Sequence, residues 1–139
     1  MASYVKYNDF VTQLATGTHN LTAAGNVVKA AIHTDAPVVA TDVGLADLTQ
    51  ISGTGYTSGG NDIQNDISNS GGTLTATGVD VVWTAGAADW TSTARYVSTY
   101  NDTSTGDKLI NYWDYGTTFA LGNGETFTLD FGASWFTLV

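Results

Sequence analysis

The chain contains no cysteine, which excludes disulfide frameworks, thiolate nucleophiles and zinc sites built on cysteine. Long hydrophobic runs are also missing. The uninterrupted apolar stretches are a few residues long, whereas a membrane-spanning helix needs about 20. The first residues, Met1–Lys6, contain no apolar core of a signal peptide, so we expect synthesis in a host cytoplasm.

Basic residues are scarce. Lys and Arg total 4 against 13 Asp plus Glu, which gives a formal net charge of -9 and a pI of about 4.1. Proteins bind phosphate backbones and anionic lipids mainly through Lys and Arg. We therefore expect neither a nucleic-acid partner nor a membrane partner.

The residues that are abundant favour strands and turns over helices. Of 139 residues, 16 are Gly, one is Pro, and Glu125 is the single Glu, while Thr is the most frequent type. Thr suits the half-buried surface of a strand, and Gly supplies the positive φ of tight turns. With 42% hydrophobic residues, the composition predicts one mainly β domain with a real core, spanning residues 1–139.

One amphipathic helix is predicted at the start of the chain, from Ser3 to Ala15, within an N-terminal segment of residues 1–17. Ser3 is its expected N-cap and Gly17 its expected C-terminal left-handed residue. Four apolar residues fall at i, i+3, i+4 and i+7 and form one stripe: Tyr7, Phe10, Val11 and Leu14. Such a short helix needs support, so the stripe must pack on the domain's own sheet or on a neighbouring subunit. These four residues are the candidate interface.

Residues 26–139 are predicted to form a β-sandwich or jelly-roll-like domain of about eight strands, with an up-and-down barrel as the alternative. The expected strands are Asn26–His33, Val79–Thr84, Ala94–Tyr100, Lys108–Tyr115, Glu125–Phe131 and Trp135–Val139. Val79–Thr84 is nearly all apolar and is expected to be buried on both faces. Ser52–Gly72 is expected to be loop-like. The expected core residues are Val28, Ile32, Val82, Tyr96, Leu109, Trp113, Phe127, Leu129 and Phe131.

No pattern of catalytic or metal-binding residues stands out. His19 and His33 lie outside any recognisable motif, and no nucleophile elbow, H-E-x-x-H or P-loop sequence is present. Asn61, Asp62, Asn65 and Asp66 supply oxygen ligands of the kind calcium takes, and Asn101–Asp107 distantly resembles a calcium loop. Ordinary hairpin and loop roles explain these residues better. We expect no enzymatic activity, no cofactor and no metal.

Two kinds of binding remain. The aromatic group Tyr112–Tyr115 could stack on sugar rings, but in a strand Trp113 and Tyr115 share one face and Tyr112 lies on the other. Part of the group is therefore expected in the core. A protein interaction surface fits the composition better, because interface cores are depleted of charge and this exterior is rich in Thr.

Several segments in order along the chain resemble a family of small virion-associated proteins of tailed bacteriophages. They are Met1–Tyr4 with Phe10, Ala36–Thr41, Leu45–Ile51, Gly55–Gly60, Arg95–Val97, Tyr100–Ser104, Leu109–Gly116 and Gly124–Phe131. The resemblance implies a structural protein of the virion and transfers no catalytic or ligand residue.

Three places in a virion are open to such a protein. The leading hypothesis is a decoration or cement protein on the head, which contacts the major capsid protein or other virion proteins and is itself a homo-oligomer. The alternatives are a tail or baseplate component and a fibre-type protein that binds carbohydrate on the host surface.

Overall fold

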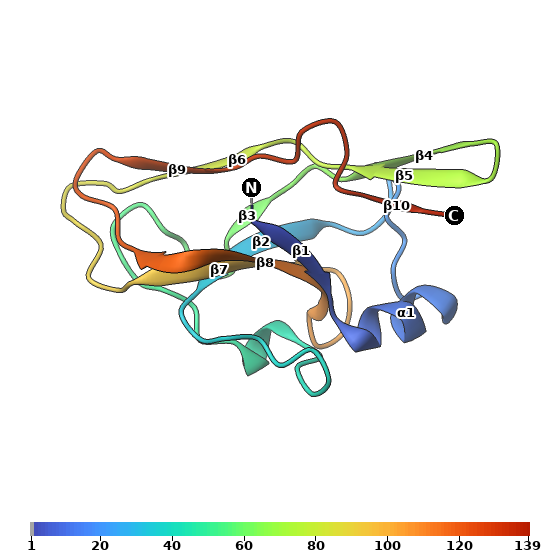
Figure 1. Ribbon diagram of the computed structural model, residues 1–139, viewed down its shortest axis with the longest axis horizontal. Coiled ribbons are helices and arrows are strands. Elements are labelled where there is room, and N and C mark those ends of the chain that lie inside the picture. Colours follow the sequence, from blue (N-terminus) through green and yellow to red (C-terminus); the bar gives the residue numbers. More distant parts are fainter. Residues whose placement is uncertain (1) are drawn as a thin grey trace.

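The computed structural model describes residues 2–139 and is mainly β, with the strands arranged in two layers (Figure 1). The helices are α1 (Asn8–Ala15) and the short 3-10 helix η1 (Leu45–Asp47). The strands are β1 (Ser3–Lys6), β2 (Val28–His33), β3 (Asn61–Asp62), β4 (Asp66–Ser70), β5 (Thr73–Thr77), β6 (Val81–Thr84), β7 (Ala94–Asn101), β8 (Lys108–Phe119), β9 (Thr126–Leu129) and β10 (Phe136–Leu138).

The first layer is a five-stranded antiparallel sheet in the order β1-β8-β7-β2-β3. The second layer consists of a three-stranded sheet, β10-β5-β4, and a two-stranded sheet, β6-β9. Figure 1 shows these two small sheets side by side above the five-stranded sheet, with α1 past the end of β1. The short helix η1 packs on the opposite face of the five-stranded sheet. The predicted mainly β, sandwich-like fold is confirmed, with ten strands instead of about eight.

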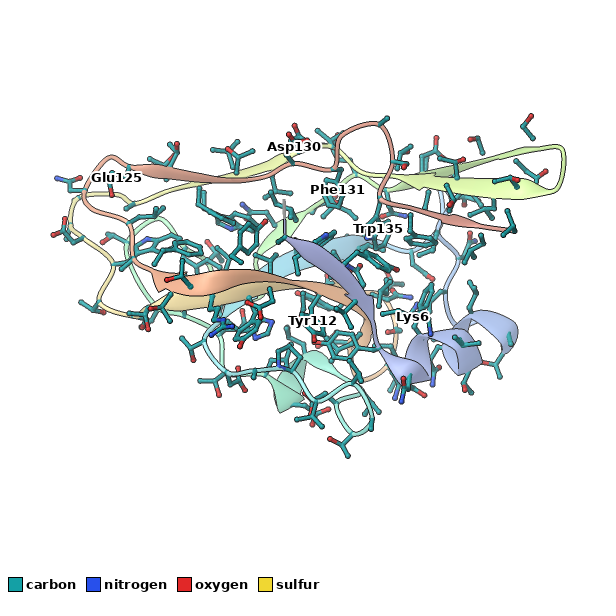
Figure 2. All side chains as sticks on the ribbon, in the orientation of Figure 1. Lys6, Tyr112, Glu125, Asp130, Phe131 and Trp135 are labelled. Atoms are coloured by element: carbon teal, nitrogen blue, oxygen red, sulfur yellow. The ribbon has the colours of Figure 1, made fainter. Side chains whose placement is uncertain are left out.

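The main core lies between the two layers and is rich in aromatic residues. Trp83, Leu129, Phe131 and Trp135 come from the second layer, and Phe131 and Trp135 point inward in Figure 2. Buried polar side chains also lie in this core: Asn111 of β8 accepts hydrogen bonds from Trp135 Nε1 at 2.8 Å and from the Thr99 hydroxyl at 2.6 Å. Its bond to the indole fixes one layer relative to the other.

A second, smaller core covers the opposite face of the five-stranded sheet. The first part of the connection after β2 crosses that face and buries Leu45 and Leu48 against Ala31, Tyr100 and Leu109. Strand β7 is therefore buried on both faces over almost its whole length. The five-stranded sheet becomes the middle layer of this part of the molecule.

The predicted helix Ser3–Ala15 is wrong in its first half. Ser3–Lys6 forms strand β1, which pairs with β8 from Ser3↔Asp114 to Lys6↔Asn111, and α1 begins at Asn8 with Tyr7 as its N-cap. The open edge of β8 offers these residues a ladder of backbone hydrogen bonds, which outweighs their weak helical pattern. The end of the helix is confirmed, because Gly17 has φ +80.

Two predictions about strands are also wrong. Strand β6 alternates between buried and exposed residues, and Val82 is 52% exposed, because nothing covers the outer face of the second layer. The segment predicted as a loop contains β3 and β4, and β4 continues into β5 through Gly71 (φ +59) and Gly72 (φ +85). Two consecutive positive φ values are the requirement of a tight type I′ hairpin.

Candidate interaction surface

The helix stripe predicted as an interface lies mostly inside the protein. Tyr7 is 0% exposed and Phe10 is 1% exposed, so neither can contact a partner, and that prediction is corrected. Phe10 packs edge-on against Phe136 with ring centroids 5.7 Å apart, and Leu14 is half-buried against the same core. Val11, at 53% exposure, is the one member of the stripe on the surface. The stripe is the domain's own packing face.

Tyr7 ends a chain of buried hydrogen bonds whose direction the chemistry fixes. His33 Nδ1 lies 3.0 Å from the backbone carbonyl of Asp35, which can only accept, so Nδ1 carries the proton. His33 Nε2 then accepts from the Ser98 hydroxyl at 2.8 Å. The Tyr7 hydroxyl in turn donates to Ser98 Oγ at 2.8 Å. Each of these three hydrogen bonds therefore has one defined donor and one defined acceptor.

This serine–histidine–aspartate arrangement resembles a nucleophilic triad in its bonding, and the carboxylate of Asp35 lies 3.4 Å from His33 Nδ1. However, Ser98 and His33 are both 0% exposed, and the Tyr96 ring stacks on the imidazole at 5.5 Å. A substrate carbonyl cannot reach Ser98 Oγ in this conformation. Burial also lowers the pKa of His33, which keeps the imidazole neutral. The arrangement ties Asp35, at the start of the connection after β2, and Tyr7 to the five-stranded sheet.

His19 is the second predicted histidine, and it belongs to a buried hub at the end of β7. Its Nδ1 accepts from Asn101 Nδ2 at 3.1 Å, and the same amide donates to the carbonyl of Thr18 at 3.1 Å. Its ring packs on Phe10 at 5.4 Å, and burial lowers the pKa of His19 to about 4. The proton therefore sits on Nε2, which has no hydrogen-bond partner within residues 2–139.

The residues considered as calcium ligands serve as loop anchors. Asn65 is buried, accepts from the backbone N–H of Val28 and donates to the carbonyl of Leu21. One oxygen of Asp66 accepts from the backbone N–H of Ala23 at 3.1 Å. Together with Asp62 these side chains line an open cavity of about 420 Å³. Among residues 2–139, no group of three or more His, Cys, Asp or Glu side chains is arranged to hold a metal ion.

Most carboxylates share this anchoring role. Ten of the acidic side chains accept a backbone N–H: Asp35, Asp42, Asp47, Asp62, Asp66, Asp80, Asp89, Asp114, Glu125 and Asp130. These bonds close turns and loops. They hold the pKa of Asp47 below its usual value, because the carboxylate accepts from Val43 and Gly44.

The aromatic group in β8 divides between the two cores as its alternation predicts. Trp113 is 8% exposed and contacts Tyr4 and Phe131 edge-on, while Tyr112 packs against Tyr7 on the other face. Trp113 and Tyr115 also line a shallow cavity of about 240 Å³ between the layers. Packing therefore occupies most of the ring surface that a sugar would need.

The most regular surface is the outer face of the second layer. Apart from Asp66 at the start of β4, which lies opposite Thr77, its outward side chains are uncharged and short: Ser68, Ser70, Thr73, Thr75, Thr77, Val82, Thr84, Thr126, Thr128 and Thr137. We call this set the hydroxyl face. Ser68, Thr75 and Thr137 lie opposite one another across three strands, and Thr128 lies opposite Val82. The signal in the sequence is Thr at every second position in β5 and β9, which sequence analysis did not single out.

Charge is divided unequally between the two layers. All four basic residues, Lys6, Lys29, Arg95 and Lys108, belong to strands of the five-stranded sheet. Residues 61–93 and 120–139, which build the second layer and β3, contain no basic residue, but they contain Asp62, Asp66, Asp80, Asp89, Glu125 and Asp130. The second layer is therefore purely anionic.

Comparison of the chain with protein-family models, with curated proteins and with solved structures gives no match. Within the described part of the chain, no helix has the length and apolar character needed to cross a membrane.

Proposed function

We propose that this protein is a non-enzymatic structural component of a tailed-bacteriophage virion, and that it decorates the exterior of the head. The proposal combines the family resemblance, whose segments are spread in order from Met1 to Phe131, with the physical character of the surface. The hydroxyl face is the single observation that carries it.

A decoration protein works by static contact, so its docking surface must be rigid before it binds. Ser, Thr and Val have short side chains with few rotatable bonds, and they lose little entropy when a partner covers them. The hydroxyl face consists of such residues on regular strands. A surface of this kind supports lasting attachment better than it supports turnover of a substrate.

The interior is equally consistent with a static role. Ser98 and His33, which could act as a nucleophile and a base, are buried and hydrogen-bonded, and most of the carboxylates close turns. Each contact across a joint between capsid subunits adds a modest free energy, and many copies together resist the pressure of packaged DNA.

Deletion of the gene from the phage tests this proposal. Particles that lack the protein are expected to assemble but to lose DNA at a lower temperature, or on chelation, than complete particles. Antibody labelling of complete particles, viewed by negative stain, is expected to mark the head. Label on the tail, or unchanged heat resistance in the deletion, contradicts head decoration.

A host-surface binding role is the second candidate, favoured by the cavity that Trp113 and Tyr115 line. It predicts that deletion particles keep their heat resistance but fail to adsorb to cells. It also predicts that soluble glycans change the tryptophan fluorescence of the purified protein, and that Tyr115→Ala abolishes this change. A flat titration rejects it.

A further inference from the structure

We propose that the hydroxyl face is the docking surface of this protein and that its occupant is a cationic protein surface, one that presents Lys and Arg side chains. This inference rests on the proposed function, because it identifies the face and the partner chemistry through which attachment to the virion occurs.

The first step is the uneven distribution of charge between the two layers. Three of the four basic side chains are already paired within the five-stranded sheet and its flanks, Lys29 with Asp102 at 2.9 Å and Arg95 with Asp114 at 2.8 Å, while Lys108 lies 3.9 Å from Asp9. The second layer has carboxylates and no base with which to pair them. Charge complementarity across an interface governs orientation and partner choice. The second layer therefore presents its negative potential to whatever covers the hydroxyl face.

The second step is a pair of carboxylates at the edge of this face. Asp80 directly precedes β6 and Asp130 directly follows β9, and these strands pair at Val81↔Leu129. Figure 2 shows Asp130 pointing away from the other layer. Like charges on neighbouring strands are destabilising. One oxygen of each carboxylate caps a backbone N–H, of Phe131 and of Gly132, which leaves its second oxygen for an outside donor.

The third step excludes other occupants. A second copy docked through the same face would bring two purely anionic layers together, which costs free energy. A phosphate backbone or an anionic lipid surface is repelled for the same reason. A cationic protein surface has the opposite charge and can also meet the hydroxyl groups, since hydroxyls both donate and accept hydrogen bonds.

The face also has the right internal composition. Val82, 52% exposed, gives it an apolar spot beside Thr128, and the remaining residues are polar but uncharged. Depletion of charge at the centre with charged groups at the edge is the usual arrangement of protein interfaces. A basic partner surface would thus place its Lys and Arg side chains at Asp80 and Asp130 and its uncharged atoms over the threonines.

The test measures binding of purified protein to particles that lack it, at rising NaCl concentration. Asp80→Asn/Asp130→Asn keeps the oxygens that cap the backbone but removes two charges. The matched control, Asp42→Asn/Asp107→Asn, removes two charges from the segments that flank the five-stranded sheet. We expect the first variant to bind at least about tenfold more weakly, with a shallower salt dependence, and the control to bind like wild type.

A second pair of variants tests the face itself. Thr128→Arg places a long cation on the hydroxyl face and is expected to abolish binding, whereas Thr12→Arg, on the exposed side of α1, is expected to leave it unchanged. Equal binding by both double variants, or by both arginine variants, overturns the assignment of this face and leaves the virion role standing. If wild-type protein does not bind the particles at all, the virion role fails and this inference fails with it.

Discussion

The imidazole of His33 and the hydroxyl of Ser98 are joined by a buried hydrogen bond of 2.8 Å between β2 and β7. Ser98 stands at the centre of the chain of bonds, because its oxygen also accepts from Tyr7, which lies between β1 and α1. A single hydroxyl therefore connects the start of the chain, the middle of the five-stranded sheet and the loop that crosses its outer face. A bonding pattern that resembles a catalytic triad here serves stability.

Ser98→Ala is expected to lower the free energy of unfolding by about 1–3 kcal/mol. It leaves the Tyr7 hydroxyl and His33 Nε2 buried without their partner, and an unsatisfied buried polar group costs that much. Ser92→Ala is the matched control, because Ser92 bonds Ser52 at 3.2 Å on the exposed surface, and its expected loss is below about 0.5 kcal/mol. Urea denaturation of the two variants provides the comparison. Equal losses in the free energy of unfolding would show that the buried hydrogen bonds of Ser98 stabilise the fold no more than the exposed bond of Ser92.

The protein is expected to lose stability as the pH falls from about 6.5 towards 4. Burial lowers the pKa of both histidines, to about 4 for His19, so the unfolded chain binds protons in this range that the folded chain does not. The lowered pKa of His19 corresponds to a loss of roughly 3 kcal/mol at most in the free energy of unfolding. The hydrogen bond from Arg95 is the largest cause that lowers the pKa of Asp114. Protonation of this carboxylate at still lower pH therefore reduces the free energy of unfolding further.

Urea denaturation at pH 7.5, 6, 5 and 4.5 measures this dependence. His19→Phe keeps a ring that can pack on Phe10 and is expected to flatten the pH profile of the free energy of unfolding. Stability that stays constant between pH 7 and 5 in the wild-type protein contradicts the assignment of two neutral buried imidazoles.

Gly60→Ala is expected to be far more damaging than Gly71→Ala, although both glycines have positive φ, +68 and +59. A Cβ on Gly60 would lie 1.8 Å from the backbone oxygen of Ala30, whereas a Cβ on Gly71 meets nothing within 4 Å. The backbone of β2 cannot move aside, so the expected loss is at least about 3 kcal/mol for Gly60→Ala and about 1–2 kcal/mol for Gly71→Ala. Thermal melting that shifts equally for both variants contradicts this close approach.

The strands of the second half of the chain could be predicted because period-2 patterns act locally. β7, β8 and β9 appear where alternation places them, and Leu129 and Phe131 are buried as expected. The segment Ser3–Lys6 could not be assigned, because its conformation depends on the open edge of β8, more than a hundred residues away in the sequence. β4 was missed because Ile67 is its only aliphatic residue and its other side chains are polar.

The surface was harder to predict than the core. An apolar helical stripe looks the same in a sequence whether it packs on the protein's own core or on a partner. The burial of Phe10 shows that this stripe packs on the protein's own core. The hydroxyl face was missed for the opposite reason. Threonines such as Thr75 and Thr128 are polar and appear ordinary one at a time, and only the strand pairing places them on one surface.

Leu129 and Val82 provide a final test of which face of the second layer is covered. Leu129 of β9 is 1% exposed between the layers, and Val82 of the adjacent β6 is 52% exposed on the outer face. Leu129→Ala is expected to cost about 2–5 kcal/mol, because it removes buried methyl groups and leaves a cavity. Val82→Ala is expected to cost less than about 0.5 kcal/mol in the isolated protein.

The same two variants should reverse their order of effect when attachment is measured instead of unfolding. Val82→Ala removes apolar surface from the hydroxyl face and is expected to weaken binding to particles that lack the protein. Leu129→Ala, tested at a temperature where it remains folded, is expected to bind as wild type does. A large loss of stability in Val82→Ala would mean that the outer face is covered within the isolated protein, and the register of β6 against β9 would then be wrong.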